Sequence, residues 1–166
     1  MSERVVLAER RRDGPYELFR SQWADTDRLL RAVLEREPIE SLLDDSWTAC
    51  GQVGWGELVD ELSYLTLNLC LRRDGADFAA YLPVWAGIPT GERDQTPANC
   101  GALVRVTSRP EYNRLRRRLR QQKARLGVAI ERGEITVETA QHRLLAGVGP
   151  RTRDVAASAR HLLDSE

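Results

Sequence analysis

The apolar positions near the start of the chain fall into two short runs separated by a turn signal. Val5 to Ala8 is apolar at four consecutive positions, which is typical of a strand covered on both faces. Asp13-Gly14 supplies the turn, because this pair tolerates the positive φ angles of tight hairpins. We therefore predict a β-hairpin made of residues 5–11 and 16–23.

A second hairpin is predicted by the most regular alternation in the chain, in residues 64–72. Leucines occupy every second position on one face of this segment. Its polar face carries four residues: Tyr64, Thr66, Asn68 and Cys70. Asp74-Gly75 supplies the turn and residues 77–85 supply the returning strand. Pro83 lacks the N–H that a ladder needs, so we expect this strand to lie at a sheet edge or to end close to Pro83.

Helical spacing appears after residues 25–26, which offer two helix caps, and ends near Pro38. Short helical pieces are expected at residues 39–45 and around residues 58–62. A fifth strand is predicted at residues 102–107. Two glycine-containing segments are predicted to be loops: residues 46–55 and 89–101.

The last third of the chain predicts three helices. Ser108 and Glu111, three residues apart, fit a capping box at the start of the first. Gly133 stands where its C-terminal cap would lie. Further helices are predicted after Thr136 and across residues 153–163.

These elements indicate an α+β fold. We expect a small, mainly antiparallel sheet of about five strands, two Asp-Gly hairpins plus one strand, with packed helices and a C-terminal helical segment. At 166 residues the chain fits a single domain. Residues 1–107 would form the sheet part with inserted helices, and residues 108–166 the C-terminal helical part.

The helix predicted after Ser108 is strongly basic. Its cationic residues, with no acidic residue among them, are Arg114, Arg116, Arg117, Arg118, Arg120, Lys123 and Arg125. At 100° per residue the apolar positions fall on one side: Tyr112, Leu115, Leu119, Leu126 and Ile130. We expect the helix to dock by this narrow apolar stripe and to expose a cationic surface.

The two parts of the chain differ in charge although the formal net charge is zero. Residues 1–107 hold 12 arginines against 18 acidic residues, a net charge of −6. Residues 108–166 hold 13 basic residues against 7 acidic ones, a net charge of +6. This asymmetry favours either an anionic partner on the C-terminal part or attraction between the two parts.

Residue types that carry catalysis or bind metals form no local motif. Cys50, Cys70 and Cys100 are odd in number and widely spaced, which favours a reduced compartment over a disulfide framework. His142 and His161 lack the short spacings of metal ligands. We therefore expect no metal, no cofactor and no catalytic set, and we lean away from an enzyme.

The start of the chain lacks the apolar core of a signal peptide, and no apolar run approaches the roughly 20 residues that span a bilayer. We expect a cytoplasmic protein with no membrane partner.

Three stretches carry a resemblance to a known family. They are RVVLAER, DGPYEL and SQW within residues 4–23, AY and WAG within residues 80–87, and GALV at residues 101–104. Here the chain resembles an uncharacterised family, a domain of unknown function, from halophilic archaea. The resemblance implies a small intracellular α+β protein of archaeal origin and brings no activity. The chain departs from that family at Gln22, where the family often has His, and in being neutral rather than strongly acidic.

The basic helix is the strongest functional candidate. Guanidinium groups bind phosphate bidentately, and on the order of four to six such contacts support salt-sensitive, sequence-independent binding. Because Tyr112 points inward, backbone contact with a duplex or structured RNA is favoured over stacking on a single strand. The leading hypothesis is a non-enzymatic binding or regulatory protein that contacts an anionic partner, with nucleic acid as the first candidate.

Three alternatives stay open. In the first, the arginines have no functional role: they form a solvated face or pair with carboxylates of the chain itself. A protein-interaction or homo-oligomerisation module would place the same surface on an acidic patch, for which the candidates are Asp44, Asp45, Glu57, Asp60 and Glu61. A small enzyme would use the polar row of Tyr64, Thr66, Asn68 and Cys70 as a pocket, with residues 89–101 as a lid.

Overall fold

A seven-stranded mixed sheet forms the centre of the computed structural model, which describes residues 4–43, 46–91, 94–149 and 153–164. The strands, in the spatial order β3-β2-β1-β4-β5-β6-β7, are β1 (Val5–Arg10), β2 (Tyr16–Ser21), β3 (Thr48–Val53), β4 (Leu69–Asp74), β5 (Asp77–Trp85), β6 (Gly101–Val106) and β7 (Arg153–Val155). The α-helices are α1 (Thr26–Leu34), α2 (Trp55–Glu61), α3 (Arg109–Glu131), α4 (Val137–Ala146) and α5 (Ala157–Arg160), and Glu40–Leu42 forms a 3₁₀ turn. β1 and β4 are parallel, and the other neighbouring strands are antiparallel. The predicted α+β class and the mainly antiparallel sheet are confirmed.

Both predicted hairpins are present. Gly14 follows β1 with φ 136° and Gly75 follows β4 with φ 61°, conformations that glycine adopts without steric cost. In the second hairpin Asp74 pairs with Asp77, so Gly75 and Ala76 form a two-residue turn. The Asp-Gly signals therefore located both chain reversals.

Two edge strands were not predicted. Residues 46–55 were expected to be a loop, but Thr48–Val53 pairs with β2 as the strand β3. Five of its six residues are exposed, so no apolar alternation marked it. The predicted helix at residues 153–163 is also wrong: β7 pairs with β6 there, and the four-residue helix α5 follows. Both edges depend on a neighbouring strand that is distant in sequence.

The strand predicted at residues 64–72 begins late, because β4 starts at Leu69. Residues 64–66 form a turn, and Leu65 is 53% exposed, so the leucine alternation overstated the strand. The strand containing Pro83 was expected to lie at an edge or to end close to the proline; β5 lies between β4 and β6, and it ends at Trp85, two residues after Pro83. β4 pairs with β5 only from Tyr81 to Asp77, so Pro83 lies past the start of β4 and pairs with β6 alone. The proline thus occupies a local edge within an interior strand.

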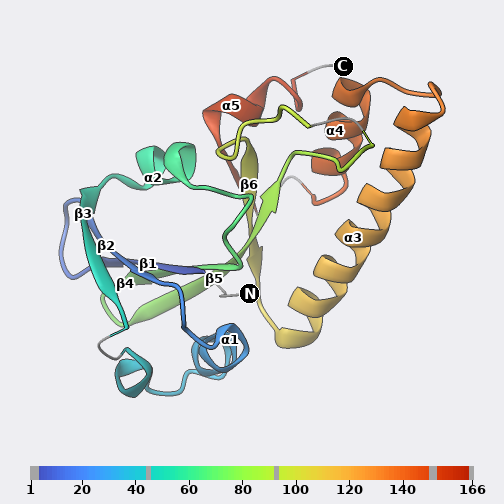
Figure 1. Cartoon of the computed structure of the whole chain (residues 1–166). Helices are drawn as coiled ribbons and strands as arrows, with labels where there is room; N and C mark the ends of the chain where they lie inside the picture. The colour runs from blue at the N-terminus through green and yellow to red at the C-terminus, as the bar shows by residue number, and fades with distance from the viewer. Residues whose placement is uncertain (1–3, 44–45, 92–93, 150–152, 165–166) are drawn as a thin grey trace.

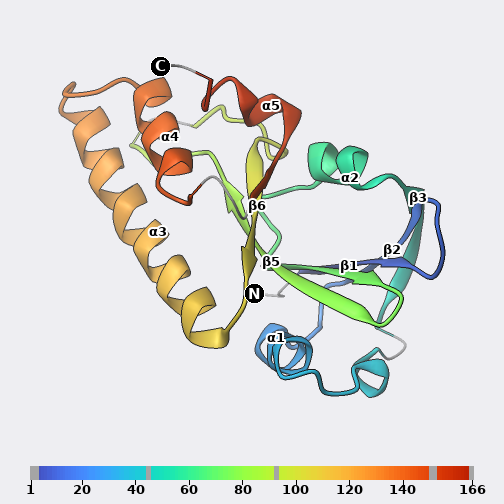
Figure 2. The same ribbon diagram turned by 180° about the vertical axis from the view of Figure 1, so that it is seen from behind.

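Helices cover both faces of the twisted sheet (Figures 1 and 2). α1, α3 and α4 pack on one face, where alternate residues of β1, β4, β5 and β6 form the larger apolar core. α2 packs on the other face with a smaller core. In Figure 1 α1 lies below the first strands, and the twist of the sheet brings the same face round to α3 beside β6.

Helix α3 begins and ends as its sequence predicts. The side chain of Ser108 accepts a hydrogen bond from the Glu111 N–H at 3.2 Å, while a Glu111 carboxylate oxygen accepts from the Thr107 N–H at 2.7 Å. Gly133 has φ 70° just past the helix. At Gly127 a Cβ atom would come within 2.6 Å of the Pro89 carbonyl oxygen, so glycine permits the close approach of the loop after β5. The helix is continuous over 23 residues.

Candidate anion-binding surface on helix α3

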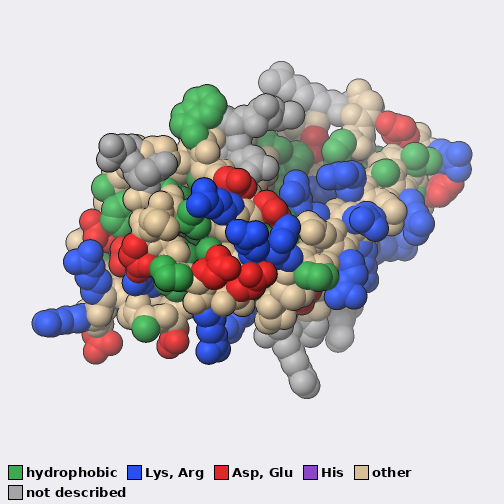
Figure 3. All heavy atoms as spheres, turned by 90° about the horizontal axis from the view of Figure 1, so that it is seen from below, with side chains coloured by type: hydrophobic (Ala, Val, Ile, Leu, Met, Phe, Trp, Pro, Cys, Tyr) green, Lys and Arg blue, Asp and Glu red, His purple; other side chains and the backbone are tan. Residues whose placement is uncertain are grey.

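The predicted docking stripe of α3 is confirmed. Tyr112, Leu119 and Leu126 are buried, and Leu115 and Ile130 are partly buried against the same core. Burial of each leucine contributes on the order of 1.5–3 kcal/mol, so a narrow stripe is enough to hold the helix on the sheet. The rest of the helix surface is left to polar side chains, and basic groups gather over the end of the molecule where α3 lies (Figure 3).

Docking of the helix divides the seven cations of residues 114–125 into two groups. We call the first the outer arginines, which are exposed and turned away from the sheet: Arg114, Arg117, Arg118 and Arg125. The second group lies along one border of the stripe and lines a cavity between α3 and β5: Arg116, Arg120 and Lys123. The sequence pattern predicted a single cationic face and did not distinguish the two.

The outer arginines have no carboxylate within ion-pair distance among the residues that the structure describes. At the start of the same helix, by contrast, Arg109 forms a 2.7 Å ion pair with Asp27 of α1. Within the described chain, the attraction between the two oppositely charged parts therefore produces an ion pair at Arg109 but none at the outer arginines. The outer arginines can therefore form ion pairs with a partner that lies outside the described residues.

Lys123 differs from its neighbours because its side chain turns inward. Its Nζ donates to the carbonyl oxygen of Trp85 at 2.7 Å and lies 5.1 Å from the centre of the Trp85 ring. Burial disfavours the charged amine and lowers the pKa of Lys123 to about 8, a shift that the negative charge of Asp94 partly opposes. The expectation that Lys123 belongs to the outward surface is thus wrong.

The predicted polar row does not form one surface, because its first three residues precede β4. The Tyr64 hydroxyl donates to the Val59 carbonyl at 2.6 Å, and Cys70 is fully buried beneath α2. Thr66 is exposed and lines a different hollow from the one that Tyr64 and Asn68 line. Burial raises the pKa of the Cys70 thiol to about 12, so it is not an activated nucleophile.

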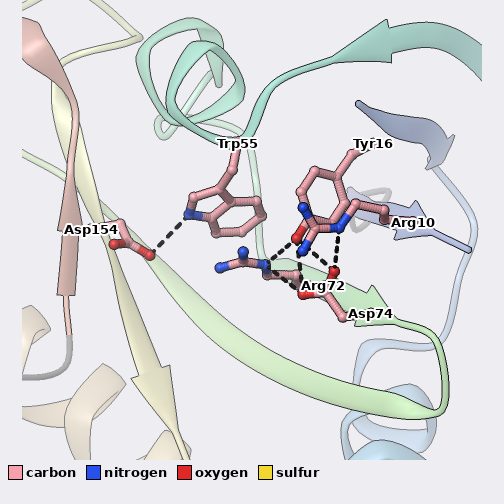
Figure 4. Close-up of polar contacts among 6 residues, drawn as sticks. All are labelled: Arg10, Tyr16, Trp55, Arg72, Asp74 and Asp154. Atoms are coloured by element: carbon pink, nitrogen blue, oxygen red, sulfur yellow. Dashed lines mark hydrogen bonds and ion pairs between the residues drawn. The ribbon is translucent and has the colours of Figure 1, made fainter. Parts of the chain in front are cut away.

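An arginine cluster on the α2 face was not predicted (Figure 4). Asp74 accepts hydrogen bonds from Arg10 Nε at 2.7 Å and from the Tyr16 hydroxyl at 2.8 Å, and Arg72 Nε donates to the same hydroxyl at 2.8 Å. The Arg72 guanidinium lies 4.4 Å from the centre of the Trp55 ring. We call these residues the Arg72 cluster: Arg10, Tyr16, Trp55, Arg72 and Asp74.

The Arg72 cluster joins segments that are far apart in the sequence. Trp55 Nε1 donates to Asp154 of β7 at 3.1 Å, so the cluster links β1, β2, α2, β4 and β7. Partial burial by itself raises the pKa of Asp74, but the hydrogen bonds from Tyr16 and Arg10 and the charge of Arg72 lower it further, so the net pKa is below its usual value. Each charge in the cluster already has a partner, as is typical of a structural network.

The other candidate residues are dispersed. Cys50 is exposed, Cys100 is buried, and neither they nor Cys70 form a disulfide. His142 Nδ1 contacts the carbonyl oxygen of Leu162. Across the described ranges, no three residues of the His, Cys, Asp and Glu types gather as metal ligands would. None of the helices in those ranges carries an apolar stretch long enough to cross a bilayer.

The acidic complement proposed for an interaction module is partly engaged within the chain. Asp60 accepts a hydrogen bond from the Ala157 N–H at 2.6 Å, which holds α2 to the start of α5. Glu57 and Glu61 are exposed on α2. Asp44 and Asp45 lie outside the described residues.

Comparisons of the chain with models of protein families, with curated proteins and with solved structures found no match in any of the three. The resemblance to a haloarchaeal family therefore stays a prediction.

Proposed function

We propose that this protein is a non-enzymatic binding protein that contacts the phosphate backbone of nucleic acid through the basic surface of α3. The observation that supports this best is that the outer arginines form no ion pair: Arg114, Arg117, Arg118 and Arg125 are exposed, and within the described chain none lies within ion-pair distance of a carboxylate. Arginine presents a planar set of donors that matches two phosphate oxygens at once.

The dimensions of the helix suit a duplex. Residues 114–125 span about 16 Å along the helix axis at about 1.5 Å per residue, which is close to half a turn of B-form DNA. The absence of acidic residues across that span keeps the local potential positive along its whole length. Several backbone phosphates can therefore be contacted together by one rigid element.

The same surface is poorly suited to reading bases. The hydroxyl of Tyr112 donates to the carbonyl oxygen of Asn68 at 2.7 Å, so this ring faces the protein and offers no stacking platform. Gln122, whose amide type can read adenine, donates to the Arg143 carbonyl at 3.2 Å. We therefore expect binding that depends strongly on salt and weakly on sequence.

The test compares two variants with the same change of charge. One replaces the outer arginines by glutamine: Arg114→Gln, Arg117→Gln, Arg118→Gln and Arg125→Gln. The control replaces four exposed arginines elsewhere: Arg12→Gln, Arg20→Gln, Arg28→Gln and Arg31→Gln. Fluorescence anisotropy with a labelled duplex of about 20 base pairs measures the affinity between about 50 and 200 mM salt.

The outer variant is expected to bind the duplex about 10- to 100-fold more weakly at low salt, with a slope of log K against log salt that is shallower by about 0.9 for each lost phosphate contact. The control variant should bind as the wild type does. Equal losses in both variants would mean that net charge, and not this surface, attracts the duplex. If the wild type binds no duplex but light scattering gives a dimer mass that the outer variant loses, the surface serves self-association and the proposal is wrong.

A further inference from the structure

The cavity beside α3 has a volume of about 410 Å³. It lies between α3, the second half of β5 and the segment that precedes β4, and its polar and charged lining includes Asn68, Arg116, Arg120 and Lys123. Leu82, Val84 and Leu119 contribute apolar lining, and none of the described residues that line the cavity is acidic. Volumes of about 300–1,000 Å³ are typical of sites for small molecules.

The cavity exists because β5 is longer than its neighbour. β4 starts at Leu69 and leaves β5 unpaired on that side beyond Tyr81, while β5 continues to Trp85. Residues 64–66 form a turn and do not continue β4 alongside β5, and Tyr64 and Leu65 line the cavity. The hollow is therefore a consequence of the strand lengths and does not depend on a loose loop.

Two hydrogen bonds from α3 hold the walls of the cavity. The Tyr112 hydroxyl donates to the Asn68 carbonyl, and Lys123 Nζ donates to the Trp85 carbonyl. The Trp85 ring is itself fixed, because its Nε1 donates to the carbonyl oxygen of Pro97 at 3.0 Å. The ring also packs closely on Gly87, where a Cβ atom would come within 2.2 Å of it. Arg116 and Arg120 lie one helical turn apart between these anchors, so the cationic groups are brought together in a shaped site.

We propose that this cavity binds a phosphate monoester attached to a small organic group, with Arg116, Arg120 and Lys123 holding the phosphate and Trp85 with the apolar lining receiving the attached group. A monoester dianion carries more charge than the diester of a nucleic-acid backbone and can enter a hollow end-on, whereas a diester is substituted on both sides. Three cations match that charge, because no acidic residue is among the described lining and Asp94 acts on Lys123 from outside it. The source of the phosphate is either a free mononucleotide or the 5′ end of a nucleic-acid strand. The inference does not rest on the proposed function, because the residues that border the cavity are not the outer arginines.

Isothermal titration of the full chain with AMP, adenosine and inorganic phosphate at low salt tests the proposal. AMP is expected to bind saturably and at least about tenfold more tightly than adenosine, because the phosphate supplies the charge-assisted hydrogen bonds. The variant Arg116→Gln with Arg120→Gln should weaken AMP binding at least about tenfold. The matched pair Arg117→Gln with Arg118→Gln, on the outer face, should stay within about twofold of the wild type.

Two oligonucleotides that differ only in a 5′-phosphate or a 5′-hydroxyl distinguish the sources of the ligand. A 5′-phosphate preference that Arg116→Gln with Arg120→Gln removes assigns the site to strand ends, and tighter binding of AMP than of the phosphorylated strand assigns it to mononucleotides. Equal binding of AMP and adenosine, no saturable AMP binding up to about 10 mM, or equal losses in both arginine pairs would overturn the proposal. Loss of duplex binding in the outer variant with AMP binding retained would leave the two sites separate.

The pH dependence provides a second readout. The groups facing Lys123 are Arg116 and Arg120 of α3, Tyr64 before β4 and Asp94 after β5. The affinity for AMP should rise as the phosphate ionises near pH 6 and fall above about pH 8 as Lys123 loses its proton. An affinity that is constant from pH 7 to pH 9.5 would exclude Lys123 from the site.

Discussion

Arginines on the two sides of this molecule have opposite surroundings. In the Arg72 cluster, Arg10 and Arg72 lie 2.7 and 3.2 Å from the carboxylate of Asp74, and both guanidinium groups lie over the Tyr16 ring at about 5 Å. On α3, the outer arginines are exposed and make no ion pair with the described residues. The same residue type thus joins strands in one region and coats a helix in the other.

The difference shows how a neutral chain can present a strongly basic surface. Where carboxylates and aromatic rings are brought beside an arginine, its charge is compensated and its contacts contribute to the stability of the fold. Where they are not, a row of like charges costs stability within the chain, and the proposed partner would supply the counter-charge. The comparison therefore predicts that mutations in the Arg72 cluster lower the stability of the fold. Mutations of the outer arginines should weaken binding and leave the stability nearly unchanged.

The largest contrast is expected between Arg72→Ala and Arg118→Ala. Arg72 is three-quarters buried, donates to Tyr16 and lies over the Trp55 ring, so its removal should lower the free energy of unfolding by about 2 kcal/mol. Arg118→Ala should change it by less than about 0.5 kcal/mol, as is usual for exposed sites. Urea unfolding of both variants measures the difference, and similar losses would contradict the division of the arginines into two groups.

A smaller effect is expected at Asp74 and depends on pH. Because the pKa of Asp74 is lowered in the folded state, its ion pairs stabilise the protein above the unfolded-state pKa of about 4 and are lost as the pH falls through the folded-state value. Asp74→Asn should therefore lower the free energy of unfolding by about 1 kcal/mol at pH 7, and the difference from the wild type should shrink as the pH falls below about 4. Denaturant unfolding at several pH values measures it.

The control for this prediction is Asp27→Asn, which removes the exposed ion pair with Arg109. Its effect at pH 7 should be at most about 0.5 kcal/mol. A larger loss at Asp27 than at Asp74 would show that exposure is not what separates the two kinds of ion pair.

The smallest effect is expected within α3 itself. Arg114 and Arg118 are four residues apart on the exposed side, and like charges at this spacing destabilise a helix by about 0.2–0.5 kcal/mol. Arg118→Gln should therefore raise the thermal midpoint slightly, and added salt should remove the gain by screening the repulsion. Arg10→Gln in the Arg72 cluster should lower the midpoint. If both substitutions shift it in the same direction, the contrast between the two regions fails.

Much of the fold could be predicted because its signals are local. The turns at Gly14 and Gly75, the cap at Ser108 and the buried stripe of α3 each depend on residues within a few positions of one another. β3 and β7 could not be predicted in this way. β3 is mostly exposed and β7 has three residues, so each is a strand because β2 or β6 offers it a free edge.

The candidate sites likewise combine features that local sequence sets with features that distant segments supply. The sequence alone determined that residues 114–125 form a basic helix with one apolar stripe, since helical periodicity sets which side chains share a face. Only the tertiary structure decided that Lys123 turns inward to Trp85, that Arg116 and Arg120 border a cavity, and that Arg72 has partners in Tyr16 and Trp55. The physical reason is distance along the chain. The charge of an arginine is known from its residue type, but the carboxylate, ring or cavity beside it is supplied by segments that meet only when the sheet has formed.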